Sequence, residues 1–410
     1  MEVKEKEIIY DKDDDLNLKV NPDKSTTTKN AKINKNERDY VIDIIRIIAC
    51  IIVIANHCCL QAFNEYYSEV DWSRLFEKCF LTDAIPLFFM ITGFFIVNGR
   101  NYKTIWKSTI KKVLLPTFVY ILFAQVFYMY IINKESFKWC LKNSFYNFNI
   151  QGIVRTVLTG NLEYINSLCE HLWYIFSYIK IIIWVPIIWL LCKEEKNSIL
   201  ARRIIIGFGV ISAIIIDIQK FITIPIIGNI RVYELVSREI LYVLFGYELF
   251  IHKELIKNNK KVFLFSSIIF IFTNILRYKV EQHYMVINHF YNIIGRVNFI
   301  EWQYSILSMI SGISLFSLLY SILTIKSEKT KKIILFISNK TFGIYLIHYL
   351  LLAKVDLYKF DKLGKLYQEL IYLILSISIT FISSLIIVAL INKLKEIISK
   401  VLLKINLKSD

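Results

Sequence analysis

The stretch from Tyr40 to Gln61 is a nearly continuous apolar run that carries three ionisable residues, Asp43, Arg46 and His57. Ionisable groups inside a membrane helix are costly, so they usually face a protein interior or a water-filled cavity and mark function. At 100° per residue, Arg46 and His57 point within about 20° of each other, and Asp43 lies about 40° from His57. We therefore predict one helix with all three side chains on one face.

The spacing of these residues indicates the chemistry that they could perform. Asp43 and Arg46 form an i,i+3 pair able to neutralise each other near the start of the helix. His57 lies about 16 Å further along the axis, at about 1.5 Å per residue. A charged pair at the start of the helix and a titratable imidazole deep inside the membrane favour a channel in which a reaction takes place. The alternative is a helix packed in a bundle, with the pair anchored at the interface and His57 hydrogen-bonded in the core.

The elements that would position these residues are membrane helices. The chain has 410 residues, of which 55% are hydrophobic, and a mean hydropathy of +0.48, values typical of a polytopic membrane protein. Continuous apolar runs that can cross about 30 Å of hydrocarbon favour helices over a barrel. We predict an all-α integral membrane bundle of about ten transmembrane helices, with spans at 40–61, 80–97, 113–132, 171–192, 204–223, 234–251, 262–276, 302–325, 333–353 and 368–391.

Basic residues predict the orientation of these spans. With the N-terminus placed inside, the inner segments carry 32 lysines and arginines in 109 residues, against 16 in 118 for the outer segments. By the positive-inside rule, both termini are then cytoplasmic. This rule and attraction to anionic membrane lipids account for the net charge of +16 without nucleic acid as a partner. The chain divides into a disordered cytoplasmic tail (1–38), a membrane domain (39–391) and a basic cytoplasmic tail (392–410).

A second basic cluster follows the second predicted span, in the loop GRNYKTIWKSTIKKVLLP, which would lie beside Arg46. A ligand with several phosphates would suit such a cluster, since the cluster offers charge-assisted bonds from many donors. The alternative is ordinary positive-inside charge. The basic residues of this loop are Arg100, Lys103, Lys107, Lys111 and Lys112.

Three histidines are expected at similar depth toward the outer side. His57 and His348 come late in outward-running spans, and His171 opens an inward-running span. His171 alone could be an interfacial residue in an aromatic belt with Trp173. The convergence of three histidines favours an acid–base or proton-relay site. The seven cysteines show no metal-ligand spacing, so no metal is expected, and whether the outer cysteines pair stays open.

Four stretches together resemble the membrane acyltransferase-3 family. The first helix has the family's Asp–x–x–Arg followed by a histidine about eleven residues later. PLFFMITGFFI resembles the second helix, and HLWYIFSYIKIIIWVPII resembles the fourth. ISNKTFGIYLIHYLLL resembles the penultimate helix, with the Tyr–x–x–His of Tyr345 and His348. The resemblance covers residues 38 to about 391.

The resemblance implies a bacterial cell-membrane enzyme that moves an acyl group, usually acetyl, from acetyl-CoA or another acyl-CoA to a hydroxyl of a carbohydrate. The acceptor would be a cell-surface glycan or its lipid-linked precursor. In the family the first-helix histidine is regarded as catalytic, which corresponds to His57. Basic residues of the second-to-third-helix loop are thought to engage the donor, which corresponds to Arg100, Lys111 and Lys112. Lysines stand here where arginines are frequent in the family, and they do not offer arginine's bidentate phosphate recognition.

The resulting hypothesis gives each candidate residue a role. His57 would act as general base or as covalent relay, and the sequence does not choose between these. Arg46, held by Asp43, would bind donor phosphates with the basic loop. The competing classes are a transporter or flippase for lipid-linked glycans and a non-catalytic partner in a polysaccharide-export complex. The candidates for acceptor positioning or proton transfer are His348, His171, Trp173 and Tyr345.

Overall fold

The structure is a computed structural model of the whole chain, and only part of the chain is described. The predicted disordered tail lies outside the described residues, apart from Arg38. The described residues are 38–58, 63–64, 69–70, 72–96, 101–132, 134–146, 167–221, 236–291, 305–352 and 366–406.

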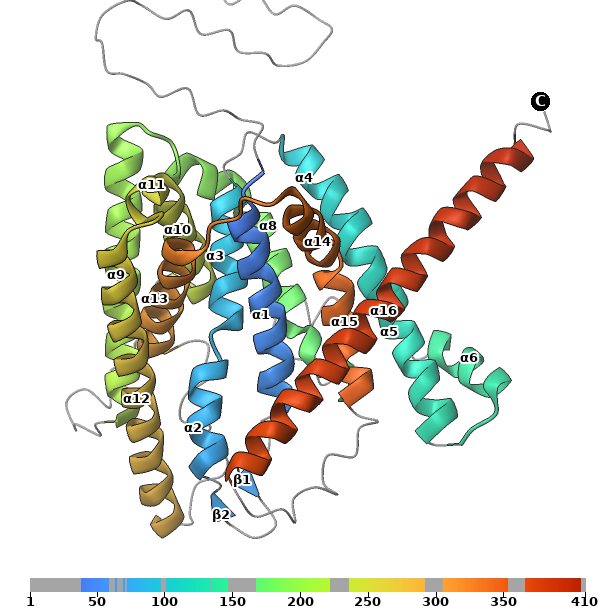
Figure 1. Cartoon of the computed structure of the whole chain (residues 1–410), viewed down its shortest axis with the longest axis horizontal. Coiled ribbons are helices and arrows are strands. Elements are labelled where there is room, and N and C mark those ends of the chain that lie inside the picture. Colours follow the sequence, from blue (N-terminus) through green and yellow to red (C-terminus); the bar gives the residue numbers. More distant parts are fainter. Residues whose placement is uncertain are drawn as a thin grey trace, which may run out of the picture. The chain divides into compact units, whose positions relative to one another are not determined.

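The described part of the chain is all-α apart from one pair of two-residue strands, β1 (Phe63–Asn64) and β2 (Glu69–Val70), which pair antiparallel (Figure 1). The first half contains α1 (Tyr40–Cys58), α2 (Trp72–Leu81), α3 (Ala84–Ile96), α4 (Tyr102–Thr109), the π-helix η1 (Ile110–Leu114), α5 (Leu115–Phe127), the π-helix η2 (Tyr128–Ile132), α6 (Phe137–Tyr146), the 3₁₀ helix η3 (Ser167–Leu172) and α8 (Trp173–Leu191). The second half contains α9 (Lys196–Phe221), α10 (Arg238–Ile251), α11 (Lys253–Ile256), α12 (Lys260–Tyr291), α13 (Ile306–Ile322), α14 (Glu328–Ser338), α15 (Thr341–Leu352) and α16 (Leu366–Asn406).

Seven helices in the described residues are long and apolar enough to cross a membrane, or eight if α14 and α15, bent by 55° at their break, form one span. The predicted count of ten is not confirmed. Two of the predicted spans correspond to helices that are shorter than a crossing needs, α10 with 14 residues and α13 with 17. At about 1.5 Å per residue these helices measure roughly 21 and 26 Å, against about 30 Å of hydrocarbon. The seven spans are Tyr40–Cys58, Phe76–Phe95, Tyr102–Tyr130, Trp173–Leu191, Lys196–Ile218, Lys260–Gln282 and Leu373–Val401.

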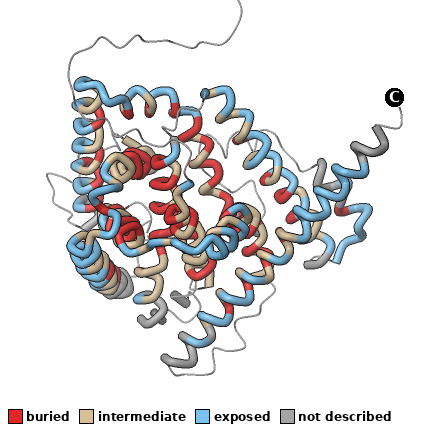
Figure 2. Tube along the Cα trace, turned by 45° about the horizontal axis from the view of Figure 1, so that its top comes forward, coloured by how far each residue is buried: buried red, intermediate tan, exposed pale blue. Residues whose placement is uncertain are grey.

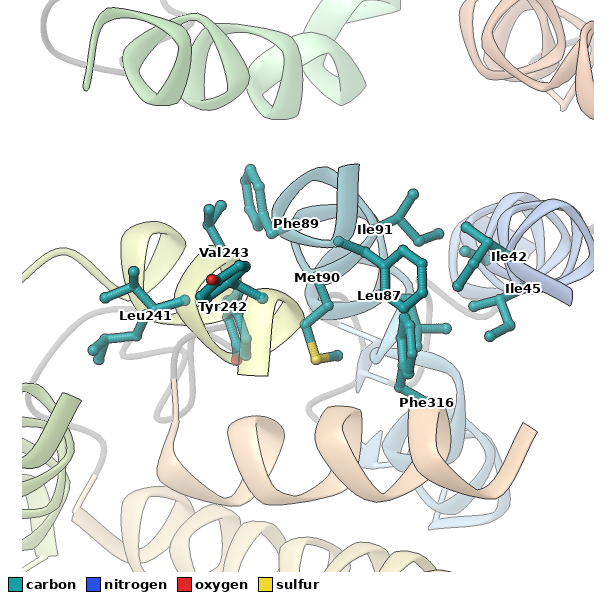
Figure 3. Packing of buried hydrophobic residues seen from close by; sticks show 14 of the residues in the cluster. Ile42, Ile45, Leu87, Phe89, Met90, Ile91, Leu241, Tyr242, Val243 and Phe316 are labelled. Carbon is teal, nitrogen blue, oxygen red and sulfur yellow. The ribbon is translucent and has the colours of Figure 1, made fainter. Parts of the chain in front are cut away.

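The core is built where α3 packs against α10, with α1 and α13 beside them (Figure 3). The two helices approach closely because each has a glycine at the contact. A Cβ on Gly93 would lie 1.9 Å from the Val243 carbonyl oxygen, and one on Gly246 would lie 2.0 Å from that of Met90. Side chains of four helices fill the space around this contact: Ile42 and Ile45 of α1, Leu87, Phe89 and Ile91 of α3, Leu241 and Tyr242 of α10, and Phe316 of α13.

A second apolar cluster joins α1, α5, η3, α8 and α15. Its members include Val53 of α1, Tyr120 of α5, Leu172 of η3, Ile175 of α8 and Leu346 of α15. This cluster supports the elements that carry the predicted histidines. On the other side of α1, α16 packs against α1 and α15 through a few buried residues, and the rest of its surface is largely exposed (Figure 2). In a membrane protein, such exposed apolar surface faces lipid.

Candidate active site

The candidate site lies where the end of α1 meets η3 and the middle of α15. Asp39 fixes the start of α1, because its carboxylate accepts a hydrogen bond from the Val41 backbone nitrogen (3.0 Å) and another from the Tyr320 hydroxyl (2.7 Å). The helix then runs without interruption to Cys58. His57 is therefore carried to the far end of α1, about 16 Å from Arg46, as the helical spacing predicted.

The three histidines expected at similar depth lie together. The ring centroids of His57 and His348 are 5.3 Å apart, those of His171 and His348 are 5.1 Å apart, and those of His57 and His171 are 6.5 Å apart. His171 and His348 are buried, and His57 is partly exposed. Three imidazoles from three separate elements thus face one small volume. In the part of the chain that the structure describes, no group of three or more His, Cys, Asp or Glu residues is arranged to hold a metal ion.

Tyr345 connects two of these histidines. Its hydroxyl donates a hydrogen bond to the backbone carbonyl of His171, and its own carbonyl oxygen lies 2.7 Å from Nδ1 of His348. A carbonyl can only accept, so Nδ1 of His348 carries a proton and Nε2 is the basic nitrogen of the neutral ring. The tautomer of His348 is therefore set by the turn of α15 on which it stands.

Four ring nitrogens of the cluster are buried atoms without a hydrogen-bond partner among the described residues: Nδ1 of His57, Nδ1 and Nε2 of His171, and Nε2 of His348. Buried polar groups normally have partners, so such atoms need an explanation. Nδ1 of His57 and Nε2 of His348 are ring nitrogens that could exchange a proton with a hydroxyl brought close to them. Nε2 of His348 carries no proton in this tautomer, so it can only accept one from the hydroxyl.

Two aromatic residues of the cluster were not predicted from the sequence. The ring of Tyr349 stacks on His171 with centroids 5.0 Å apart and lies edge-on to His57 at 5.2 Å. The Tyr120 ring of α5 is edge-on to His171 at 5.7 Å. The His–Tyr dipeptide at 348–349 is the signal that could have drawn attention to Tyr349. Trp173, a predicted candidate, opens α8 two residues after His171, and its ring contacts Tyr174 at 6.5 Å.

The predicted pair at the start of α1 is present and has a third member. Arg46 Nη1 lies 3.1 Å from Asp43 Oδ1, and the Ser338 hydroxyl donates to the same oxygen at 2.6 Å. Arg46 Nη1 also donates to Ser338 Oγ at 3.2 Å. Ser338 ends α14, and the bend that follows brings it to α1. The Asp43 side chain is 3% exposed and that of Arg46 is 26% exposed, so the guanidinium can reach a ligand and the carboxylate cannot.

The predicted donor loop is only partly described. Lys111 and Lys112 lie on η1, a π-helix, and both are exposed. π-helical turns are rare in proteins, and those that occur often lie at functional sites. Lys103 and Lys107 are also exposed, on α4. Arg100 lies outside the described residues.

A second buried charge network was not predicted from the sequence. Arg277 of α12 and Asp83, just before α3, form an ion pair of 3.1 Å, and both side chains are 0% exposed. Arg277 also donates to the Cys79 carbonyl and to Ser308 Oγ, each at 2.9 Å. The sequence predicts Arg277 in a loop after a span that ends at 276, whereas the structure has it within the long helix α12. The network joins α2, α3, α12 and α13 and contains no member of the histidine cluster.

Comparison with known proteins identifies the family of the chain. Residues 39–390 match the acyltransferase domain family designated acyltransferase-3, which is most of the chain. The protein therefore belongs to the acyltransferase-3 family, and it is a helical membrane protein of that family. No curated protein and no solved structure matches the chain.

Proposed function

We propose that this protein is an O-acyltransferase that moves an acyl group, acetyl in the first instance, from acyl-CoA to a hydroxyl of a cell-surface glycan or its lipid-linked precursor. Family membership supports acyl transfer in general. The observation that carries the proposal is the meeting of His57, His171 and His348, with buried ring nitrogens that have no partner in the described structure. A hydroxyl acceptor needs a base, and neutral imidazole is the side chain most often used for it.

His57 is the proposed catalytic residue, by one of two routes. As a general base, it takes the hydroxyl proton while the oxygen attacks the thioester carbonyl carbon. The carbon–sulfur bond breaks, and the imidazolium returns the proton to the departing sulfur of coenzyme A. As a relay, the unprotonated imidazole nitrogen attacks the carbonyl first and expels coenzyme A, whose sulfur takes the proton of the other ring nitrogen. The acceptor hydroxyl then displaces the imidazole and gives its proton to the ring. Both routes need a neutral ring at the start.

The surrounding residues would position the acceptor and share the proton. His348 can accept a proton at Nε2 only, because Nδ1 bonds the Tyr345 carbonyl. The Tyr349 ring, which stacks on His171 and is itself half-buried, is an aromatic ring of the kind against which sugar rings pack. Trp173 and Tyr345 remain candidates for the same positioning role, Tyr345 through its hydrogen bond to His171.

The donor would bind at the other end of α1. Arg46, steadied by Asp43 and Ser338, offers a partly exposed guanidinium for phosphate. The exposed Lys111 and Lys112, and Arg100, would add charge to the same donor. The pantetheine arm would then cover the approximately 16 Å from Arg46 to His57. This route requires that the start of α1 and both chain termini face the cytoplasm, in a bacterial cell membrane whose lipids surround the bundle.

The test is acyl transfer by the purified full-length protein in lipid nanodiscs. Acetyl-CoA labelled in the acetyl group is incubated with a de-O-acetylated surface glycan and, separately, with a lipid-linked glycan. The proposal predicts label in an alkali-labile ester on one of the glycans, with one coenzyme A thiol released for each ester. His252→Gln is a matched control, because that side chain is 56% exposed, and it should transfer at the wild-type rate. Thiol release without ester, or no reaction of either kind, would overturn the proposal.

A further inference from the structure

The last part of α16 changes character along one continuous helix (Figure 1). Between Ile371 and Ile391 its exposed residues are apolar apart from Ser378, and its buried residues pack against α1 and α15. From 392 to 401 every residue is exposed, and the sequence NKLKEIISKV mixes apolar and charged residues (Figure 2). The helix thus becomes two-faced at Asn392.

The apolar residues of this segment form one face. Their exposed fractions are 58% for Leu394, 48% for Ile397, 57% for Ile398 and 50% for Val401. At 100° per residue these four side chains fall within an arc of about 100°. Such a stripe is normally covered by something apolar, and none of the described residues covers it.

The charged residues are arranged around that stripe. Lys393, Lys395 and Lys400 point about 90–110° from the centre of the apolar arc, so lysines flank it on both sides. Glu396 points about 150° away, on the opposite face, where it pairs with Lys400 at 2.7 Å. Lysines at the boundary between an apolar and a polar face can extend their ammonium groups toward phosphates while their stems stay on apolar surface.

Length indicates that this segment lies outside the hydrocarbon. The apolar span Leu373–Val401 has 29 residues and would measure about 43 Å, against about 30 Å of hydrocarbon. Tilt alone would have to exceed the usual range of about 0–40° to fit it in. Such a tilt would also draw Lys393 and Lys395 into the membrane, where each charge costs several kcal/mol.

We propose that residues 392–401 form an interfacial amphipathic helix that binds the anionic lipid surface of the membrane. Leu394, Ile397, Ile398 and Val401 enter the boundary between headgroups and acyl chains. Lys393, Lys395 and Lys400 contact lipid phosphates. A second copy of the chain is a poorer occupant, because two such helices would bring their flanking lysines together. The segment anchors α16 at the surface and is independent of the catalytic proposal.

The experiment measures the depth of the two faces in the full-length protein. Ile398→Cys reports the apolar face, and Ser399→Cys, the next residue, reports the polar face. Each variant carries a nitroxide and is reconstituted into vesicles of phosphatidylcholine with phosphatidylglycerol. Collisions with oxygen and with an aqueous nickel chelate are then compared. Unsubstituted protein treated with the same reagent gives the background from native cysteines, of which the described ones are buried or, for Cys58, half-buried.

The proposal predicts a label at 398 that is reached by oxygen and shielded from nickel, and a label at 399 with the reverse preference. Lys393→Gln, Lys395→Gln and Lys400→Gln each remove one charge. Each should lower the ratio of membrane-docked to undocked 392–401 segments about fivefold. Loss of an equal charge by Lys326→Gln, Lys329→Gln and Lys332→Gln should leave it unchanged. Equal nickel access at 398 and 399, shielding of both positions from both reagents, or the same docking in pure phosphatidylcholine would overturn the proposal.

Discussion

The rings of His57 and His348 lie 5.3 Å apart, centroid to centroid, although the residues are 291 positions apart in the chain. The two histidines differ in what holds them. His348 is fixed by its bond to the Tyr345 carbonyl, while Nδ1 of His57 is buried with no partner in the described structure. A fixed imidazole beside one that has no such bond is an arrangement suited to passing a proton from an acceptor hydroxyl.

The exposed lysines of η1 allow a direct test of donor binding. Lys111→Ala with Lys112→Ala should weaken acyl-CoA binding, because two charges near the donor phosphates are lost. The loss should shrink at high salt, since screening already removes the long-range part. Both side chains are exposed, so folding should be unchanged. Equilibrium binding of labelled acyl-CoA over a salt series measures the effect.

The matched control for this experiment is Lys138→Ala with Lys142→Ala. These two lysines are also exposed, and both lie on one helix, α6. In the predicted orientation α6 is on the opposite side of the membrane. This variant should bind acyl-CoA as the unsubstituted protein does. Equal weakening by both double variants would mean that the loss reflects net charge and that η1 is not the donor site.

The ion pair at the start of α1 predicts a specific pattern of stability. Arg46→Met removes the guanidinium that pairs with the Asp43 carboxylate, which is 3% exposed, and should cost about 3 kcal/mol. This is the lower end of the range for buried pairs, because Arg46 is itself 26% exposed. Adding Asp43→Asn to Arg46→Met should recover much of the loss. Thermal unfolding of the unsubstituted protein and the two variants measures this, and equal stability of the single and double variants would contradict the assignment.

The contact between α3 and α10 predicts that its glycines cannot be enlarged. Gly93→Ala and Gly246→Ala each place a methyl group about 2 Å from a backbone oxygen of the facing helix, so the helices must separate. Each should lower the yield of monodisperse protein, with a cost at or above the roughly 1–3 kcal/mol of ordinary overpacking. Gly207→Ala is the control, because nothing lies within 4 Å of its added Cβ. Full tolerance of Gly93→Ala would refute the close approach.

The Arg277 network predicts that a positive charge alone at position 277 does not give full stability. Arg277→Met leaves Asp83 buried and unpaired and should cost roughly 3–5 kcal/mol. Arg277→Lys should restore only part of this, because an ammonium cannot reproduce a guanidinium that bonds five groups. The exposed residue Lys279, two positions on, is the control as Lys279→Met. Thermal unfolding measures all three, and wild-type stability of Arg277→Lys would contradict the expectation.

Much of the site follows from sequence because it depends on regular helices. The spacing of Asp43, Arg46 and His57 fixes their common face once residues 40–58 are helical, and the structure has that helix. The meeting of His57 with His348 and His171 follows from span order and depth. The roles of these residues in acyl transfer remain predictions.

Other features depend on breaks and tertiary contacts that periodicity does not encode. Ser338 reaches Asp43 only because the chain bends by 55° between α14 and α15. Arg277 is buried because α12, which is 32 residues long, continues to Tyr291, beyond the predicted end at 276. Hydropathy also counts apolar residues beyond helix ends, which is why α10 and α13 were predicted as full spans. The helices are shorter than those runs.

The central claim is that His57 carries the chemistry, and its most direct test is acyl transfer by His57→Gln beside His57→Ala. Glutamine keeps polarity and approximate size but cannot accept a proton or an acyl group. Both variants and the unsubstituted protein are compared at matched, monodisperse concentration, with acyl-CoA binding measured on the same samples. We predict that both variants bind acyl-CoA normally, because the proposed donor contacts lie about 16 Å away. Their rate of acyl transfer should fall by about 10²–10⁴-fold or more. Near wild-type transfer by His57→Gln would show that His57 is a structural histidine and would contradict the mechanism.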